Sequence, residues 1–437
     1  MELVKTIIIG AGPTGLSVDY HLNGNGIVLE NLPVVGGLCR SFEMNDVVFD
    51  IGGHSFHTAH NTIRSFIPNE LGVELFLQKR DARILFKGSV IPYPWQRFFH
   101  LIDDKKVVED CIKGLEMRPQ YSQPKNLHDF ILVKYGTGIA QHFLFPYNRK
   151  LWRHNLGEIS CDWASERIVS FRNKPSAEIN ASEQRTPLDE NSLVGYPAKG
   201  GFNVIFKKMA ARLSNIQFEQ KVCFIDPHSN LLRTSRGDVF KWEKIVSTMP
   251  VTELVTMVRD VPNHIVQLAN ELPYVSLQVD FFVTSEPLVG VPQRLYCADA
   301  DMPAHKIVFN SLSSENERNK PYHSIISETS IGDFGKSSCC DRTARIFKRL
   351  CDVGLIKDKM KILSHRYELV KYAYPVRGRQ VKRIMDSLNA YLEHLGIYSI
   401  GRFGQWEYIN IDQCFLKSKQ LAERLISEQD IRVAIPS

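Results

Sequence analysis

The sequence lacks the patterns that most quickly place a protein in a class. Its nine cysteines form no CxxC pair, no HExxH occurs, and no segment repeats at a fixed period. These absences argue against a zinc site of the usual spacing and against a repeat protein. No apolar run approaches the length of about 18 residues that spans a bilayer.

The odd number of scattered cysteines is typical of reduced thiols in a cytosol. At the N-terminus, MELVKTIIIGAG holds an apolar run that is too short for a signal peptide and leads directly into a glycine motif. We therefore expect a cytoplasmic protein with no membrane span.

Composition limits the size and partners of the protein but does not decide its function. With 437 residues, 43% hydrophobic and 23% charged, the chain can build a large core in two or three structural units. The net charge of +6 suits small anionic ligands as well as nucleic acid. Because the basic run VRGRQVKR has no interleaved aromatic residues, we interpret it as a solvated face and expect no nucleic-acid partner.

The stretch GGHSFHTAH, residues 52–60, places His54, His57 and His60 at intervals of three and resembles a metal-binding tract. On a helix, positions i and i+6 lie roughly 120° apart, and on a strand i and i+3 point to opposite sides. Three ligands would not converge, so we expect no metal. Solvated loop histidines and a loop beside a cofactor remain as alternatives.

The segment KTIIIGAGPTGLSVDYHLNGNGIVLE has the pattern of a nucleotide-binding strand, turn, helix and strand. Gly10, Gly12 and Gly15 give the GxGxxG spacing directly after a β-branched run. The first glycine permits the tight turn, the second lets a pyrophosphate approach, and the third lets helix pack on strand. Glu30 ends the second strand, where an acid can bind a ribose hydroxyl and repels a 2′-phosphate, so the motif suits FAD or NAD.

The next segment, NLPVVGGLCRSF, favours FAD. Gly36 and Gly37, followed by Arg40 and Ser41, would bring further N–H groups and a hydroxyl to the same pyrophosphate. A third β run, residues 47–51, ends on two glycines, so the histidine stretch is expected at a strand end on the cofactor side of the sheet.

These motifs, in this order, resemble the FAD-dependent amine-oxidase and protoporphyrinogen-oxidase-like superfamily, and within it the UDP-galactopyranose mutase family. The resemblance covers nearly the whole chain. Its segments are GAGPTGLS, GGLCRS, GGHSF, IPYPWQ, FPYNRKLW, YPAKGGFNVIF, KIVSTMPVTEL, KYAYPV and GRFGQWEY.

The resemblance implies an α/β fold with a discontinuous Rossmann-like FAD-binding domain, a helical insertion domain and an antiparallel β-sheet substrate domain. Residues 96–180 contain helix-like stretches and residues 270–330 β-rich runs, in agreement with that plan. The expected FAD-binding parts are 1–90, 196–260 and 376–437, the helical domain is 91–195, and the antiparallel-sheet domain is 261–375.

The mutase family interconverts pyranose and furanose forms of a nucleotide sugar without net redox change. The resemblance therefore implies an isomerase in which N5 of reduced FAD is the nucleophile on the anomeric carbon. Side chains then need only hold the diphosphate and shield the site, so no catalytic triad is required. The resemblance also implies that the substrate is UDP-galactopyranose or a related compound. It implies an external reductant such as NAD(P)H, and a role for galactofuranose in polysaccharide biosynthesis.

The resemblance also assigns individual residues. His54 and Tyr374 are expected to be catalytic. Substrate contacts are expected from Arg83, Asn148, Trp152, Lys199, His305, Lys306, Tyr374 and Tyr408. FAD contacts are expected from Gly10, Gly12, Gly15, Glu30, Gly36, Gly37, Arg40, Ser41, Gly53, His54, Val222, Gly401, Arg402, Asn410 and Ile411.

Three departures from the family put details in doubt. Lys199 stands where family members often have Arg, and His305 with Lys306 lies near the position of another family Arg. Lys lacks the bidentate fork of Arg, so the geometry of phosphate binding is open. Asn410 replaces an acid, which keeps hydrogen bonding but removes charge.

Two other functions stay open at this point. One is an FAD-dependent oxidase or desaturase of the same superfamily, and the other is a non-catalytic binding module that resembles the Rab escort and GDP-dissociation-inhibitor proteins. A complete FAD motif set argues against the binding module. The sugar, the nucleotide and the oligomeric state, a homo-oligomer included, are not fixed by the sequence.

Overall fold

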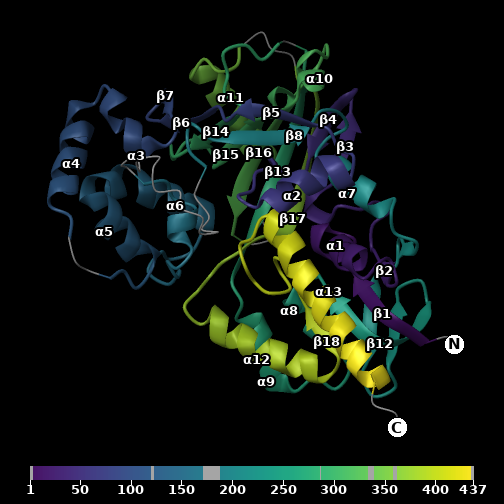
Figure 1. Ribbon diagram of the computed structural model, residues 1–437. Coiled ribbons are helices and arrows are strands. Elements are labelled where there is room, and N and C mark those ends of the chain that lie inside the picture. The colour runs from purple at the N-terminus through teal and green to yellow at the C-terminus, as the bar shows by residue number, and fades with distance from the viewer. Residues whose placement is uncertain are drawn as a thin grey trace.

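The computed structural model describes residues 3–119, 123–170, 188–285, 287–332, 339–357 and 362–434. Figure 1 shows two β-sheets that meet near the middle of the molecule, with a separate group of helices beside them. One sheet is mostly parallel and Rossmann-like, and the other is mostly antiparallel. This arrangement confirms the predicted α/β fold class.

Helices cover both faces of the mostly parallel sheet, whose strands run in the order β10-β11-β12-β1-β2-β9, with β18 beside β12. Ile8 packs into the core on one face, whereas Ile7 and Ile9 pack into the core on the other. This explains why the first strand is apolar at consecutive positions. The strands are β1 (Leu3–Ile9), β2 (Ile27–Leu29), β9 (Ile216–Gln217), β10 (Val222–Asp226), β11 (Leu231–Thr234), β12 (Val239–Ser247) and β18 (Ile397–Ser399).

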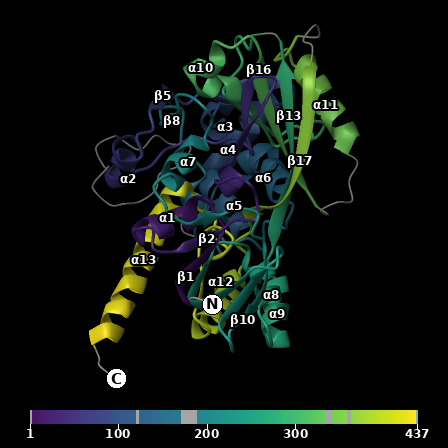
Figure 2. The ribbon, with the colours of Figure 1, turned by 90° about the vertical axis from the view of Figure 1, so that its right-hand side faces the viewer.

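The helices of this layer form two sets. Figures 1 and 2 show α13 (Ile411–Ala434) running beside α1 (Pro13–His21), and α7 (Val204–Ala210) shares their core. The other face is covered by α8 (Val251–Met257), α9 (Asn263–Asn270) and α12 (Val381–His394). In the described part of the chain, no helix combines the length and the apolar character that a membrane span requires.

The second sheet has the strand order β17-β13-β16-β15-β14-β6-β7, and only the β14–β6 pair is parallel. Its helix α11 (Cys339–Asp352) packs with one face of the sheet, where Ile346 and Leu350 join buried residues of β14 and β15. The strands are β6 (Ala82–Phe86), β7 (Ser89–Pro92), β13 (Tyr274–Thr284), β14 (Arg294–Cys297), β15 (Lys306–Phe309), β16 (His323–Ile331) and β17 (Ile362–Pro375).

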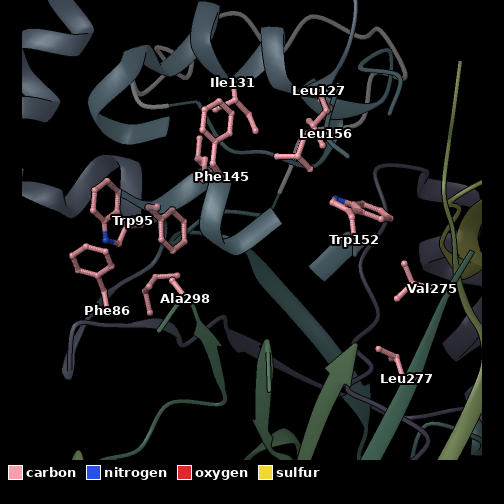
Figure 3. Close-up of a cluster of buried hydrophobic side chains, with 14 of the residues drawn as sticks. Phe86, Trp95, Leu127, Ile131, Phe145, Trp152, Leu156, Val275, Leu277 and Ala298 are labelled. Carbon is pink, nitrogen blue, oxygen red and sulfur yellow. The ribbon is translucent and has the colours of Figure 1, made fainter. Parts of the chain in front are cut away.

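The helical part joins this second sheet through a continuous apolar core. Figure 3 shows Trp95, Phe145 and Trp152 of the helices in the same cluster as Val275 and Leu277 of β13. Its helices are α3 (Trp95–Phe98), α4 (Lys105–Glu116), α5 (Leu127–Ile139) and α6 (Phe145–Trp152). The remaining elements are β3 (Ser41–Met44), β4 (Val47–Asp50), β5 (Leu75–Lys79), β8 (Leu193–Pro197), α2 (Asn61–Ser65) and α10 (Glu315–Arg318).

The structure differs from the sequence prediction at three places. Strands β6 and β7 belong to the antiparallel sheet, so that sheet recruits residues from before the expected boundary at residue 90. The β run at residues 47–51 forms a hairpin with β3 instead of joining the parallel sheet. Strands β9 and β11 were not predicted. Residues 171–180 of the expected helical stretch lie outside the described residues.

Candidate functional site

A cavity of about 740 Å³ lies where the two sheets meet. Its wall combines segments that are far apart in the sequence, because each sheet supplies one side. These segments are the turn after β1, residues 37–40, the loop after β4, residues 220–222, the start of α8, strands β13 to β17, and residues 402–414. Most of the motifs singled out in the sequence therefore meet around one cavity.

The glycine turn gives one end of the cavity its shape. Gly10 has φ +101°, a conformation that favours glycine. A Cβ on Gly15 would lie 1.9 Å from the carbonyl oxygen of Gly10, so this glycine lets α1 pack against the turn. A Cβ on Gly12 would meet only the Cα of Gly37, at 3.9 Å, and would otherwise occupy the cavity. The third glycine thus serves packing, while the second keeps space for a ligand.

Glu30 stands beside this turn at the end of β2. Its buried carboxylate accepts hydrogen bonds from the backbone N–H of Ala11 at 2.7 Å and of Leu32 at 2.9 Å. Burial raises the pKa of Glu30, while these bonds oppose that effect. The side chain lines the cavity, in the place where the sequence predicts an acid for a ribose.

Of the four residues predicted in the second glycine loop, residues 36–41, two line the cavity and two lie behind its wall. Gly37 and Arg40 line the cavity, and the Arg40 guanidinium pairs with Glu368 of β17. Ser41 differs from the prediction, because its hydroxyl donates to Asp50 at 2.6 Å and accepts from an N–H behind the wall. Gly36 also lies behind it, where its N–H binds the carbonyl of Ala11 at 2.8 Å.

The histidine loop is fixed on both sides by buried charged groups. The N–H of Gly53 donates to Glu328 Oε1 at 2.7 Å, and Arg294 donates to the carbonyls of Gly53 and His54 at 3.2 and 2.7 Å. A Cβ on Gly53 would lie 2.5 Å from a methyl of Val308, so no larger residue fits. The loop is therefore held rigidly against the antiparallel sheet.

His54 presents its ring to this cavity. The ring stacks on Phe202 with centroids 5.1 Å apart, and Nδ1 has no hydrogen-bond partner among the described residues. Burial, with the positive charge of Lys306, lowers the pKa of His54 to about 3. The imidazole is therefore neutral near pH 7, and its Nδ1 is a buried polar atom without a partner among the described residues.

His57 is not a solvated loop histidine, which was one of the two alternatives left by the sequence. It lines the cavity, its Nε2 lies 3.3 Å from the amide nitrogen of Asn410, and burial lowers its pKa to about 4. His60 lies outside the cavity wall, at the start of α2. Within the described part of the chain, no cluster of three or more His, Cys, Asp or Glu could hold a metal ion.

Glu328 is the residue that links the two sides of the site, and no sequence motif identified it. The carboxylate is 1% exposed, pairs with Lys306 at 2.7 Å and accepts from the Tyr374 hydroxyl at 3.0 Å. His305 Nε2 lies 3.6 Å from the carboxylate of Glu328. His305 was predicted to contact the substrate, but it lies inside the sheet and does not line the cavity. Lys306 and Tyr374 do line the cavity, so Glu328 orients both of them.

Several predicted substrate residues lie elsewhere. Lys199 is exposed at the end of the turn after β8 and does not reach the cavity. Trp152 donates to Asn148 at 3.2 Å inside the helical core, and only packs behind Tyr374 and Tyr408. Lys199, Asn148 and Trp152 therefore do not line the cavity, in contrast to the prediction.

Arg83 also differs from the prediction, and a neighbouring arginine replaces it. Arg83 pairs with Asp81 at 3.2 Å on the outside of β6. Arg80 instead lines the cavity, where it donates to the hydroxyl of Tyr296 at 2.8 Å. Arg83 lies opposite Leu295 in the β6–β14 pair, so its side chain points to the face of the sheet that Tyr296 does not occupy.

The C-terminal motif completes the wall. Arg402, Tyr408, Asn410 and Ile411 line the cavity, and so does Val222 from β10. Gly401 does not line it, but a Cβ there would lie 2.8 Å from the hydroxyl of Thr14, so this glycine lets the motif approach the start of α1.

The residues present fit the ADP end of FAD. The gap beside Gly12, the buried acid Glu30 and the uncapped N-terminus of α1 would take a ribose and a pyrophosphate. His54 and Tyr374 line the same cavity on the side of the antiparallel sheet. The volume of the cavity and its polar lining residues thus suit a dinucleotide whose reactive ring lies beside the antiparallel sheet.

Comparisons with known proteins agree with this architecture. Reduced UDP-galactopyranose mutase superposes with a TM-score of 0.85 at 22% identity, over 98% of this chain and 94% of the other. Wild-type putrescine oxidase bound to putrescine superposes with a TM-score of 0.67 at 15% identity, over 98% and 99%. At these identities the two likenesses show the fold alone.

A curated relative matches over a short segment. An L-amino-acid oxidase of Sistrurus catenatus edwardsii is 34% identical over 91 residues, which is 20% of this chain and 17% of that protein. The match therefore spans about a sixth of the relative's length. The model of the family named flavin containing amine oxidoreductase matches residues 13–373. Because this match extends over most of the chain, the protein belongs to the flavin containing amine oxidoreductase family.

Proposed function

We propose that the protein is an FAD-dependent pyranose–furanose mutase that acts on a nucleoside-diphosphate sugar, UDP-galactopyranose or a related compound. One observation supports this most. A single cavity joins an end suited to ADP to a wall of cations and phenols, which includes Lys306, Tyr374 and Tyr408. Such a wall suits a diphosphate and a sugar, and the fold is similar to that of a protein described as a UDP-galactopyranose mutase.

The side chains of this wall would bind and orient the substrate. Reduced FAD would supply the nucleophile, with no net redox change. Burial and the charge of Glu328 raise the pKa of Tyr374 well above its usual value, so its hydroxyl stays protonated. Tyr374 then holds its proton toward Glu328 and packs edge-on to Tyr408, with centroids 5.5 Å apart. These residues position the sugar instead of moving protons.

The main alternative is an FAD-dependent oxidase or desaturase. The short similarity to an L-amino-acid oxidase and the fold shared with putrescine oxidase favour it. A non-catalytic module that resembles GDP-dissociation inhibitors is less well supported, because it would not need the cofactor end with Gly12 and Glu30. We keep a cytoplasmic location, an external reductant such as NAD(P)H and a role in furanose-containing glycans as parts of the proposal.

The first test is the colour and turnover of the purified protein. We expect a yellow protein that releases FAD on heating and that, after reduction by dithionite, converts UDP-galactopyranose or a related nucleotide sugar to its furanose form. Chromatography of the sugar products measures this. A colourless protein without flavin would contradict both the mutase and the oxidase proposals. Steady oxygen consumption without any furanose product would support the oxidase.

The three histidines give a graded prediction for the same assay. His54→Ala should keep FAD content near that of the parent but lower turnover about 10- to 100-fold, because the ring faces the reactive end of the cavity. His57→Ala should have an intermediate effect through its contact with Asn410. His60→Ala should change stability by less than about 0.5 kcal/mol. An equal loss in all three variants that zinc restores would instead indicate a metal site.

A further inference from the structure

Two buried arginines on the cavity wall form no ion pair among the described residues, although the charges of Glu328 and Asp50 act on Arg294 from a greater distance. Arg80 is 7% exposed and Arg294 is 9% exposed, and both line the cavity. Among the described residues, neither guanidinium forms an ion pair, whereas the neighbouring Lys306 is paired with Glu328 at 2.7 Å. Burying a charge without a directly paired counter-ion is unfavourable, so an anionic ligand between the two guanidiniums would stabilise both charges.

The two arginines converge on one tyrosine. Arg80 Nη2 donates to Tyr296 Oη at 2.8 Å, and its guanidinium lies 4.4 Å from the ring centre of Tyr93. Arg294 and Tyr296 are two residues apart on β14, so their side chains share one face of the sheet. Burial alone would raise the pKa of Tyr296, but the charges of Arg80, Arg294 and Lys306 together lower it.

Both arginines retain hydrogen-bond donors for a ligand. A guanidinium has five N–H groups in a planar fork. Nη1 of Arg80 donates to the carbonyl of Leu188 at 3.1 Å, and Arg294 donates to the carbonyls of Gly53 and His54. These backbone contacts, with the hydrogen bonds of Arg80 to Tyr296 and Tyr93, hold the guanidiniums in place. The N–H groups that remain match the oxygens of a carboxylate or phosphate.

We propose that Arg80, Arg294 and Tyr296 form an oxyanion-binding site for a negatively charged group of the substrate. This proposal rests on the proposed function, because it specifies how the nucleotide sugar is held. Two groups share the required chemistry: the diphosphate itself, or a carboxylate on the sugar, as in a uronic acid. The second source would make the substrate an acidic nucleotide sugar.

The test measures ligand binding to the FAD-loaded, oxidised protein by isothermal titration calorimetry at one fixed ionic strength. The probes are UDP, UDP-galactose, UDP-galacturonate, inorganic pyrophosphate and benzoate. Arg80→Met removes one charge from the site. Arg83→Met is the matched control, because Arg83 lies on the same stretch of chain but outside the cavity.

We expect Arg80→Met to weaken the binding of at least one anionic probe about 10- to 100-fold, while Arg83→Met binds all probes like the parent. A loss shared by UDP, pyrophosphate and UDP-galacturonate would identify the diphosphate as the bound group. A loss confined to UDP-galacturonate and benzoate would identify a carboxylate. Arg80→Lys, which keeps the charge but not the fork, should lie between the parent and Arg80→Met.

Unchanged binding in Arg80→Met would overturn the site, as would a parent that binds none of the five probes. If Arg80→Met fails to retain FAD or a cooperative thermal transition, Tyr296→Phe provides the second variant, with an expected loss of about 5-fold. The turnover assay separates this result from the proposed function. A parent that binds the probes through Arg80 but forms no furanose would contradict the mutase and keep the oxyanion site.

Discussion

Glu328→Ala is expected to lower the free energy of unfolding by about 3–5 kcal/mol and to abolish turnover. The carboxylate is 1% exposed and is the counter-ion of the largely buried Lys306. Its loss would leave that ammonium without a partner and would free the N–H of Gly53 and the hydroxyl of Tyr374. The histidine loop would then lose its fixed position beside the antiparallel sheet.

The stabilising effect of Glu328 should also depend on pH. Burial opposes ionisation, but the charge of Lys306, with the neighbouring His305, outweighs it and holds the pKa of Glu328 well below its usual value. In the unfolded chain, a glutamate has a pKa of about 4.3. The stabilisation is therefore complete above that value and is lost as the pH falls through the lower pKa of the folded state. Glu328→Ala should flatten this acid limb.

A second buried glutamate provides the control. Glu317 is also 1% exposed and pairs with Lys320 at 2.8 Å, but it lies outside the cavity wall. Glu317→Ala should lower stability without changing the turnover of the folded fraction. Thermal and urea unfolding, with FAD content and turnover per bound FAD, would measure the difference. Equal effects of Glu317→Ala and Glu328→Ala on turnover would show that Glu328 has only a structural role.

The sequence predicted the features that depend on local spacing. The glycine turn, the acid at the end of β2 and the order of the later motifs each occupy a few consecutive residues, so their geometry follows from the chain itself. The alternation of Ile7, Ile8 and Ile9 between two cores is likewise local. The fold class and family membership follow from these features.

The side of the cavity that the antiparallel sheet supplies could not be predicted in the same way, because distant strands build it. Glu328 is the only charged residue in the segment SIISETSI of β16, and no motif surrounds it. It contacts Gly53, which is far away in the sequence, because the fold brings the two segments together. Arg80 contacts Tyr296 because β6 pairs in parallel with β14. No turn or sequence motif predicts this pairing. Trp152 shows the converse error. The resemblance predicted a substrate contact, yet the helix turns Trp152 into the core, while Lys150 binds backbone carbonyls of residues 297, 299 and 302.

Gly12→Ala and Gly15→Ala should separate cofactor binding from folding. Gly12 has φ −78° and ψ −177°, which alanine adopts readily, and its new methyl would project into the cavity. The FAD-free protein should therefore unfold within about 0.5 kcal/mol of the parent, whereas FAD binding should weaken about 10- to 100-fold. The methyl of Gly15→Ala would lie 1.9 Å from the carbonyl oxygen of Gly10, so α1 must shift.

We expect Gly15→Ala to cost about 3 kcal/mol or more before any ligand is present, because overpacking against backbone cannot be relieved by a side-chain rotation. Calorimetric melting of the FAD-free proteins and flavin fluorescence titrations measure the two effects separately. Parent-like FAD affinity in Gly12→Ala would contradict the view that the gap beside Gly12 holds a pyrophosphate. Parent-like melting of Gly15→Ala would contradict the packing role of the third glycine. A cofactor-binding defect in Gly12→Ala and a folding defect in Gly15→Ala would show that these two glycines have different roles in the same turn.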